Sequence, residues 1–244
     1  MIDWLRDDYR DPSVEIEGRH LPIAIRRHPR AKRLTMRLAP DGTELRVTMP
    51  KWGRTLDALA FAKAREEWIA RQLGRVPERL TIENGAHIPY RGDALEIAWQ
   101  RGGPRAVALD DGQLIFGGPE DCIESRVRKW LEAQALSLAA DDLGFYCNRA
   151  GLELPELRLT RAQRRWGSCS GDRNKGRCVR INWRLIMAPD AVRRSVVAHE
   201  TAHLVHFDHS PAFHSLLGEL YEDDLPAADA WLKSEGRTLY AAFG

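Results

Sequence analysis

The alternation of apolar and polar residues predicts a sheet near the start of the chain. Apolar side chains recur at every second position in two neighbouring runs, Leu34, Met36, Leu38 and Leu45, Val47, Met49. Such alternation is typical of strands with one buried face, and Asp41-Gly42 between the runs is a hairpin turn. A further strand-like run begins at Leu21. We expect a half-buried sheet here and treat residues 1–20 as a poorly ordered lead.

Helical spacing follows this sheet, and short strands then return. Residues 55–73 carry apolar side chains three or four positions apart, so we predict one helix, which Thr55 caps and Gly74 ends. Turn residues then separate short apolar runs, which predict antiparallel strands around 80–82, 87–90, 95–98, 106–109 and 113–116. Gly117-Gly118-Pro119 marks a boundary. Residues 21–118 are therefore predicted to be a β-rich N-terminal region with one helix.

The second half of the chain is predicted to consist of helices around one hairpin. The pattern indicates a long helix at 120–150, a strand at 157–160 and a hairpin at 165–185. A helix that begins near Pro189-Asp190 and includes the run 191–198 follows, and two closing helices are expected at 211–222 and 226–235. We assign an α+β fold, with residues 119–244 as the second domain.

The helix that begins near Pro189 contains the motif HExxH, formed by His199, Glu200 and His203. Residues four apart share one face of a helix, so two imidazoles can point at one metal ion. Glu200 lies about 100° around the helix, which suits a general base acting on a metal-activated water. Three protein ligands and one open position form the usual catalytic zinc site.

The third ligand must come from beyond the helix. His206 shares the face of His199, but a helix rises about 10 Å over seven residues, whereas a Zn–N bond is about 2.1 Å. The segment 207–211 can turn the chain back, because Pro211 disfavours helical conformation at Ser210. We therefore expect His209 to be the third ligand, with His206 as the second choice.

Alternatives remain further along the chain. Glu219 or Glu222 could replace His209 as a ligand, as a downstream glutamate does in some metallopeptidases. His206 and His214 are expected to support the ligands or to lie at the surface. Imidazole donors favour one Zn²⁺ ion, although nickel, cobalt and manganese are also compatible with them.

Composition and charge add constraints on location rather than on chemistry. The 244 residues carry 37 Lys and Arg against 35 Asp and Glu, a formal net charge of +2. No apolar run reaches the roughly 18 residues that span a bilayer, and the acidic start is unlike a secretory signal. Four scattered cysteines suggest reduced thiols, although Cys169 and Cys178 could pair or bind a second metal across the hairpin. We expect a cytoplasmic protein with no membrane association, and nothing predicts its oligomeric state.

Two runs of the chain are nevertheless strongly basic. Arg26–Arg37 contains six Lys and Arg and no acid, and Arg158–Arg184 contains nine and one acid, Asp172. If both line one cleft, the substrate is anionic, such as an acidic peptide, a nucleotide or a nucleic acid. Otherwise they are solvated strand faces.

Three segments together resemble the YgjP-like metallopeptidase family. They are RRWGSCS at 164–170, INWRLIMAP at 181–189 and VVAHETAHLVHFDHSPAFH at 196–214. The N-terminal half is also similar, so the resemblance covers about residues 20 to 236. It implies a zincin-like, metal-dependent hydrolase with His199, His203 and His209 as metal ligands and Glu200 as the base.

These observations predict a zinc-dependent hydrolase, foremost a metallopeptidase with Glu200 as general base. An extended peptide could pair with the hairpin 165–185, where Trp166, Ser168 and Asn182 are further candidates for substrate contacts. The alternative is a metal-dependent hydrolase of nucleotides or other anionic small molecules. A purely structural zinc site is disfavoured, because such sites have four ligands rich in cysteine.

Overall fold

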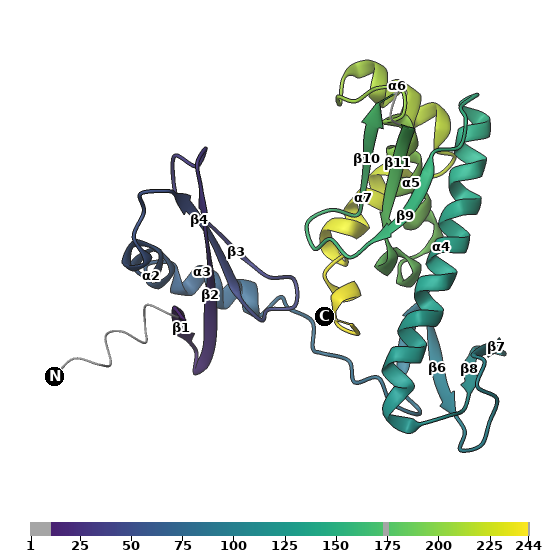
Figure 1. Ribbon diagram of the computed structural model, residues 1–244, viewed down its shortest axis with the longest axis horizontal. Helices are drawn as coiled ribbons and strands as arrows, with labels where there is room; N and C mark the ends of the chain where they lie inside the picture. Colours follow the sequence, from purple (N-terminus) through teal and green to yellow (C-terminus); the bar gives the residue numbers. More distant parts are fainter. Residues whose placement is uncertain (1–10, 173–175, 244) are drawn as a thin grey trace. The chain divides into compact units, whose positions relative to one another are not determined.

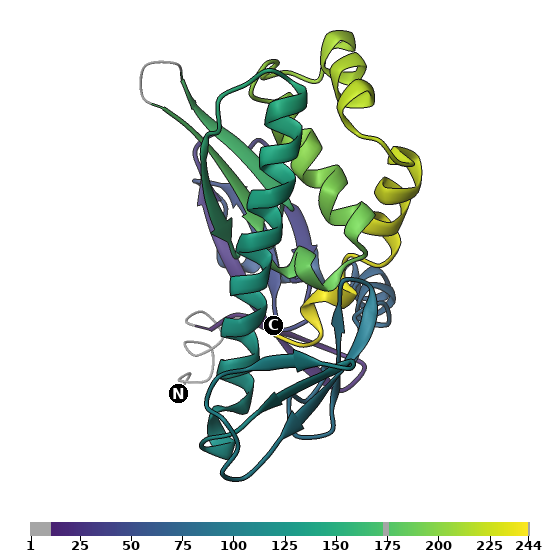
Figure 2. The ribbon, with the colours of Figure 1, turned by 90° about the vertical axis from the view of Figure 1, so that its right-hand side faces the viewer.

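A computed structural model describes residues 11–172 and 176–243 (Figures 1 and 2). The chain forms two compact units, Met1–Glu78 and Arg79–Gly244. This division precedes the expected boundary after residue 118, which falls inside the second unit. Of the predicted lead, residues 1–10 lie outside the described part. The remainder forms strand β1 (Ser13–Ile16) and the start of β2, so the lead was predicted too long.

The N-terminal unit contains a four-stranded sheet in the order β1-β2-β4-β3. Its other strands are β2 (Arg19–His28), β3 (Thr35–Leu38) and β4 (Leu45–Pro50). Strands β3 and β4 form the predicted antiparallel hairpin, whereas β2 runs parallel to β4. The turn requires Gly42, whose φ is +70°, a conformation that few other residues adopt. Alternation buries one face, including Ile23, Leu45 and Val47.

Two helices lie against this sheet where the pattern predicted one. They are α2 (Thr55–Lys63) and α3 (Glu66–Leu73), and they bury Ala58, Ala62, Ile69 and Leu73. Arg65 leaves the helical region, with φ of −125° and ψ of 25°, and this breaks the run. The break could not be foreseen, because Ala64 and Arg65 are both good helix formers.

The second unit begins with another four-stranded sheet, in the order β5-β6-β8-β7. Its strands are β5 (His87–Tyr90), β6 (Asp93–Trp99), β7 (Ala108–Asp110) and β8 (Gln113–Phe116). Strands β6 and β8 are parallel, so the expectation of a wholly antiparallel region was wrong. Residues 80–82 form no strand. Leu80 instead donates its N–H to the carbonyl of Ala241, 2.9 Å away.

A long helix and a small sheet build the rest of the core. After a short 3-10 turn η1 (Glu120–Cys122), helix α4 (Ile123–Arg149) runs for 27 residues beside the following strands (Figure 2). The sheet has the order β10-β11-β9, from β9 (Glu156–Thr160), β10 (Gly167–Asp172) and β11 (Gly176–Asn182). Strand β10 is therefore an edge strand, antiparallel to β11. The predicted hairpin ends early, because Trp183–Met187 forms the 3-10 turn η2.

Four elements complete the unit: α5 (Asp190–Ala202), α6 (Pro211–Leu220), α7 (Leu225–Ser234) and η3 (Thr238–Tyr240). Helix α5 lies against α4 and β10. A buried ion pair joins α5 to α4, with Arg193 Nε 2.8 Å from Asp142 Oδ2. Removing one member of such a pair leaves an uncompensated buried charge, so the pair fixes α5 in place. The hydroxyl of Tyr221 also donates to the Ala191 carbonyl at 2.8 Å.

The described helices include none with the length and apolar character needed to cross a membrane. All four cysteines are free. Cys169 lies opposite Val179, and Cys178 lies opposite Ser170. Because neighbouring strand residues point to opposite faces, the two sulfur atoms are on different sides of the sheet. Cys169 and Cys178 therefore form neither a disulfide nor a shared metal site across this hairpin. The cytoplasmic location stays a prediction.

Candidate metal centre

Three imidazoles converge at the end of α5. Nε2 of His199 lies 3.1 Å from Nε2 of His203 and 3.3 Å from Nε2 of His209. Ligand atoms of the three residues all lie within 4.8 Å of one another. Tetrahedral zinc with bonds of 2.0–2.1 Å places its nitrogen ligands about 3.3 Å apart. The donor set and its spacing therefore fit a single divalent ion such as zinc.

The local backbone explains why these rings meet. Helix α5 ends at Ala202, but His203 keeps helical angles, with φ of −67° and ψ of −17°, so it stays on the face of His199. The chain then turns, and Ser210 begins α6 by accepting a hydrogen bond from the Phe213 N–H. This reversal returns His209 to the other two histidines, as the position of Pro211 predicts.

A backbone contact fixes the orientation of His203. Its Nδ1 lies 2.9 Å from the carbonyl oxygen of His206. Since a carbonyl only accepts, Nδ1 carries the proton, and Nε2 presents its lone pair to the other imidazoles. Metal-binding histidines are commonly oriented by such a partner. His206 thus contributes its carbonyl here, while its ring lies outside the converging group.

Phe213 forms the wall behind the three rings. This side chain is fully buried, and its ring centroid lies 4.9 Å from His199, 4.5 Å from His203 and 4.9 Å from His209. It restricts the rotation of all three imidazoles and keeps water from behind them. The sequence analysis did not identify this residue. The sequence feature that could have indicated it is its position, four residues after His209 in the first turn of a helix that Ser210 caps.

Burial determines the charge of the neighbouring groups. It lowers the pKa of His199 to about 4, with His203 and His209 adding to the effect, so that His199 is neutral at pH 7. Glu200 is 5% exposed, and burial raises its pKa to about 7, against a hydrogen bond from the Cys169 backbone and the charge of Arg165. Such a value suits a group that both accepts and returns a proton near neutral pH.

Strand β10 passes directly over Glu200, and this explains Gly167. A Cβ added at Gly167 would lie 2.5 Å from Oε1 and 2.8 Å from Cδ of Glu200. Only glycine leaves room for the carboxyl group at this point. The glycine of the segment RRWGSCS therefore leaves space for the Glu200 carboxyl group against β10, a role that the sequence analysis did not recognise.

Replacing Gly167 by alanine is expected to lower kcat about a hundredfold, because a misplacement of about 1 Å near the reacting atoms has effects of that size. Metal content should not change, since the Cβ displaces Glu200 rather than the histidines. Steady-state kinetics and elemental analysis would measure both. Gly218→Ala is the control, because nothing lies within 4 Å of its added Cβ. Full activity of Gly167→Ala would contradict the positioning role.

The rival ligands are held elsewhere. Glu222 accepts a hydrogen bond from the Tyr146 hydroxyl at 3.0 Å and forms an ion pair with Arg194. Glu219 accepts from Ser215 at 3.3 Å. The exposed ring of His214 lies 6.4 Å from that of His209. Within residues 11–172 and 176–243, the histidine, cysteine and acidic side chains that converge are those of His199, His203 and His209.

Other candidates from the hairpin have structural partners. The amide of Asn182 is buried and donates to the Ala162 carbonyl at 2.8 Å. Trp183 is buried, and Trp166 packs against Tyr240 with ring centroids 5.8 Å apart. The basic run also has partners, because Arg158 pairs with Glu156, Arg161 pairs with Glu132 and Arg184 is buried. Trp166 and Asn182 therefore hold the hairpin in place, whereas Gly167 makes room for Glu200.

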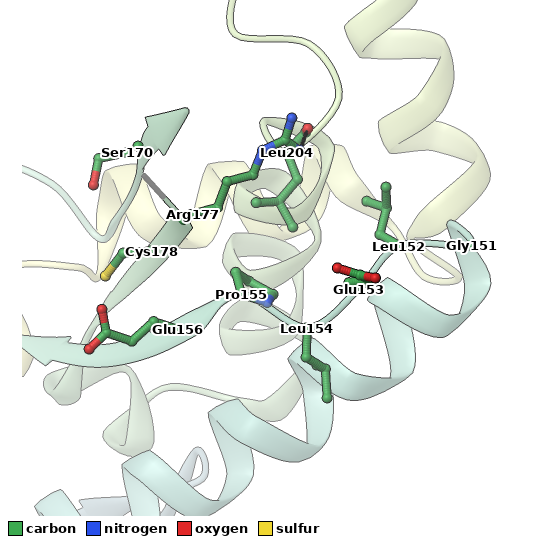
Figure 3. A pocket seen from close by; sticks show the side chains of 12 residues that line it. Gly151, Leu152, Glu153, Leu154, Pro155, Glu156, Ser170, Arg177, Cys178 and Leu204 are labelled. Atoms are coloured by element: carbon green, nitrogen blue, oxygen red, sulfur yellow. Dashed lines mark hydrogen bonds between the residues drawn. The ribbon is translucent and has the colours of Figure 1, made fainter. Parts of the chain in front are cut away.

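A cavity of about 630 Å³ lies at the far end of the small sheet (Figure 3). Its lining includes Glu153, Glu156, Arg177 and Leu204, and none of the four candidate metal-site residues belongs to it. Leu204 directly follows His203, so the cavity adjoins the end of the metal-binding segment. The candidate ligands and Glu200 lie outside it.

One of three comparisons with known proteins found a match. The family model described as YgjP-like, metallopeptidase domain, matches residues 32–235, which is most of the chain. Searches of the curated proteins and of the solved structures found no match. The match includes β10, α5 and the three converging histidines. The chain therefore belongs to the YgjP-like family, and its metallopeptidase domain makes it a metal-dependent hydrolase.

Proposed function

We propose that this protein is a zinc-dependent peptidase in which His199, His203 and His209 hold one ion and Glu200 is the general base. The observation that carries the proposal is the meeting of three imidazole nitrogens, together with the buried carboxyl group of Glu200, which follows His199 in α5. A bound zinc ion would polarise the scissile carbonyl and make a water molecule more acidic. Three ligands leave the open position that a catalytic site requires.

The chain's own residues account for the proton transfers. Glu200 accepts a proton from the attacking water and returns it to the leaving amine, for which a pKa of about 7 is suitable. Gly167 and the backbone of Cys169 keep its carboxyl group in one place. Phe213 and the carbonyl of His206 hold the imidazoles in one arrangement. Pre-organisation of this kind is a main source of catalytic power.

The edge of β10 supports a peptide as the substrate. The N–H of Asn182 donates to the Trp166 carbonyl at 2.7 Å, and antiparallel pairs alternate along the strand. Gly167, Cys169 and Gly171 therefore turn their backbone polar groups away from β11. An extended peptide can pair with these groups, apart from the Cys169 N–H that contacts Glu200. Such pairing would place its scissile bond beside the carboxylate.

A substrate panel tests this proposal against the alternative hydrolase. The zinc-loaded protein is incubated with a mixed peptide library and, separately, with nucleoside triphosphates, each with and without EDTA. Peptide cleavage is expected, EDTA should abolish it, and added zinc should restore it. EDTA-sensitive nucleotide turnover with all peptides intact would instead contradict the proposal and support hydrolysis of anionic small molecules.

A further inference from the structure

The N-terminal unit gathers two basic loops at one end of its sheet. Strands β2 and β4 are parallel, and His28 lies opposite Pro50 at their ends. The segments 29–34 and 51–54 therefore leave the sheet at the same end, where β3 also starts (Figure 1). The name basic edge is used here for the cationic side chains of these two segments together with Trp52. It consists of Arg30, Lys32, Arg33, Lys51, Trp52 and Arg54.

The positive charge of the basic edge is uncompensated. Its five cationic side chains are all exposed, and none forms an ion pair with another residue that the structure describes. The sequence has no acid from residue 18 to 40 or from 45 to 56. Asp57 follows, but its carboxylate accepts a hydrogen bond from the Arg54 N–H at 2.8 Å. Exposed Arg26 and Arg37 extend the same charge onto the sheet. A cluster of this kind attracts a polyanion.

Trp52 stands at the tip of this cluster and is 79% exposed. The N–H of Gly53 donates to the Pro50 carbonyl at 3.1 Å, so Lys51 and Trp52 occupy the tip of a tight turn. Arg27 ties the turn to β2, because Nε contacts the Gly53 carbonyl at 3.3 Å. Its Nη2 also lies 3.1 Å from Thr55 Oγ1. Hydrogen bonds thus fix the backbone of the turn, while the indole of Trp52 is exposed to solvent. An exposed aromatic side chain on an ordered turn is typical of a binding surface.

We propose that the basic edge binds single-stranded nucleic acid. The cations contact successive phosphates, and Trp52 stacks on an unpaired base, the combination that single-strand binding surfaces use. Duplex bases are already stacked and offer the indole no free face. Arginines outnumber lysines here, and their planar guanidinium groups suit both phosphate forks and stacking. A membrane surface is disfavoured, because Trp52 is the one large apolar side chain of segments 29–34 and 51–54 that is exposed, and interfacial binding needs a wider apolar face.

The first test is Trp52→Ala in the full chain, with EDTA present so that the metal centre takes no part. Anisotropy of labelled thymidine and uridine oligonucleotides of about 16 nucleotides, near the upper site size of such surfaces, measures the affinity. The variant is expected to bind about tenfold more weakly, the effect of losing one stacked base. Leu154→Ala, at another exposed position (67%), should not change affinity. An unchanged affinity for Trp52→Ala would overturn the proposal.

The second test measures the dependence of affinity on salt. Arg30→Ala, Lys32→Ala and Arg33→Ala, combined, should reduce the slope of log K against log salt by about 2, since each phosphate contact contributes about 0.7. The charge-matched control combines alanine at three exposed positions, Lys63 in α2, Arg71 in α3 and Arg75 in the turn after α3. Equal changes in both triples would overturn the proposal. So would tighter binding of duplex, or Trp52-dependent binding of anionic vesicles without binding of oligonucleotides. Peptide cleavage should be unaffected by either triple.

Discussion

Replacing Glu200 by glutamine is expected to lower kcat about a thousandfold, within the range that a positioned general base contributes. Glutamine has the same size as glutamate, so it fits beneath Gly167, where even one added carbon atom would clash. Its amide cannot accept the proton that the carboxylate takes. The three imidazoles do not depend on this charge for their arrangement, because His203 is oriented by a backbone carbonyl and Phe213 packs against all three rings.

Two measurements separate a base from a ligand. Elemental analysis of Glu200→Gln should give the metal content of the unchanged protein, while steady-state kinetics on a cleaved peptide should show the loss in kcat. Glu219→Gln is the matched control, because Glu219 is exposed and its carboxylate accepts a hydrogen bond from Ser215, away from the three histidines. Activity retained in Glu200→Gln would place the base elsewhere. Loss of metal from this variant would make Glu200 a ligand.

The parts of the fold that depend on short-range patterns were predictable. The hairpin of β3 and β4, the helix α4 and the start of α5 follow from periodicity and from turn or cap residues. The parallel pairing of β6 with β8 did not follow, because β7 lies between them in sequence and pairs with β8 on its other side. The chain also divides into two compact units after Glu78, a position that the sequence analysis did not mark as a boundary.

The candidate site divides in the same way. His199, Glu200 and His203 were identifiable because a helix fixes their relation, and His209 because Pro211 predicts the reversal that follows the helix. Gly167 and Phe213 were not identifiable. Gly167 matters through its contact with a side chain 33 positions later in sequence. Phe213 reads as an ordinary core residue until the three imidazoles are seen around it. Local spacing thus indicated the candidate ligands and the candidate base, whereas the residues that pack around them depend on tertiary structure.

Replacing His209 by alanine is expected to weaken metal binding more than about a hundredfold, which is the upper range for losing a partner that only supports a ligand. His209 lies in the segment between α5 and α6 and is exposed, so its removal should leave the fold intact. Two nitrogens from one helix then remain, and they cannot enclose an ion. Competition with a chromophoric chelator measures the affinity, and circular dichroism checks the fold.

His206→Ala is the sharper of two controls for this experiment. His206 contributes its carbonyl to the orientation of His203, and alanine keeps that carbonyl. Metal affinity should therefore be retained, as it should in His214→Ala, whose ring stands 6.4 Å from that of His209. If His206→Ala lost the metal and His209→Ala kept it, the ion would have to be bound along the helix face, and the chain reversal at residues 207–211 would have no role in the site. The 3.3 Å approach of His209 to His199 argues for the opposite outcome, because no helix-face arrangement explains it.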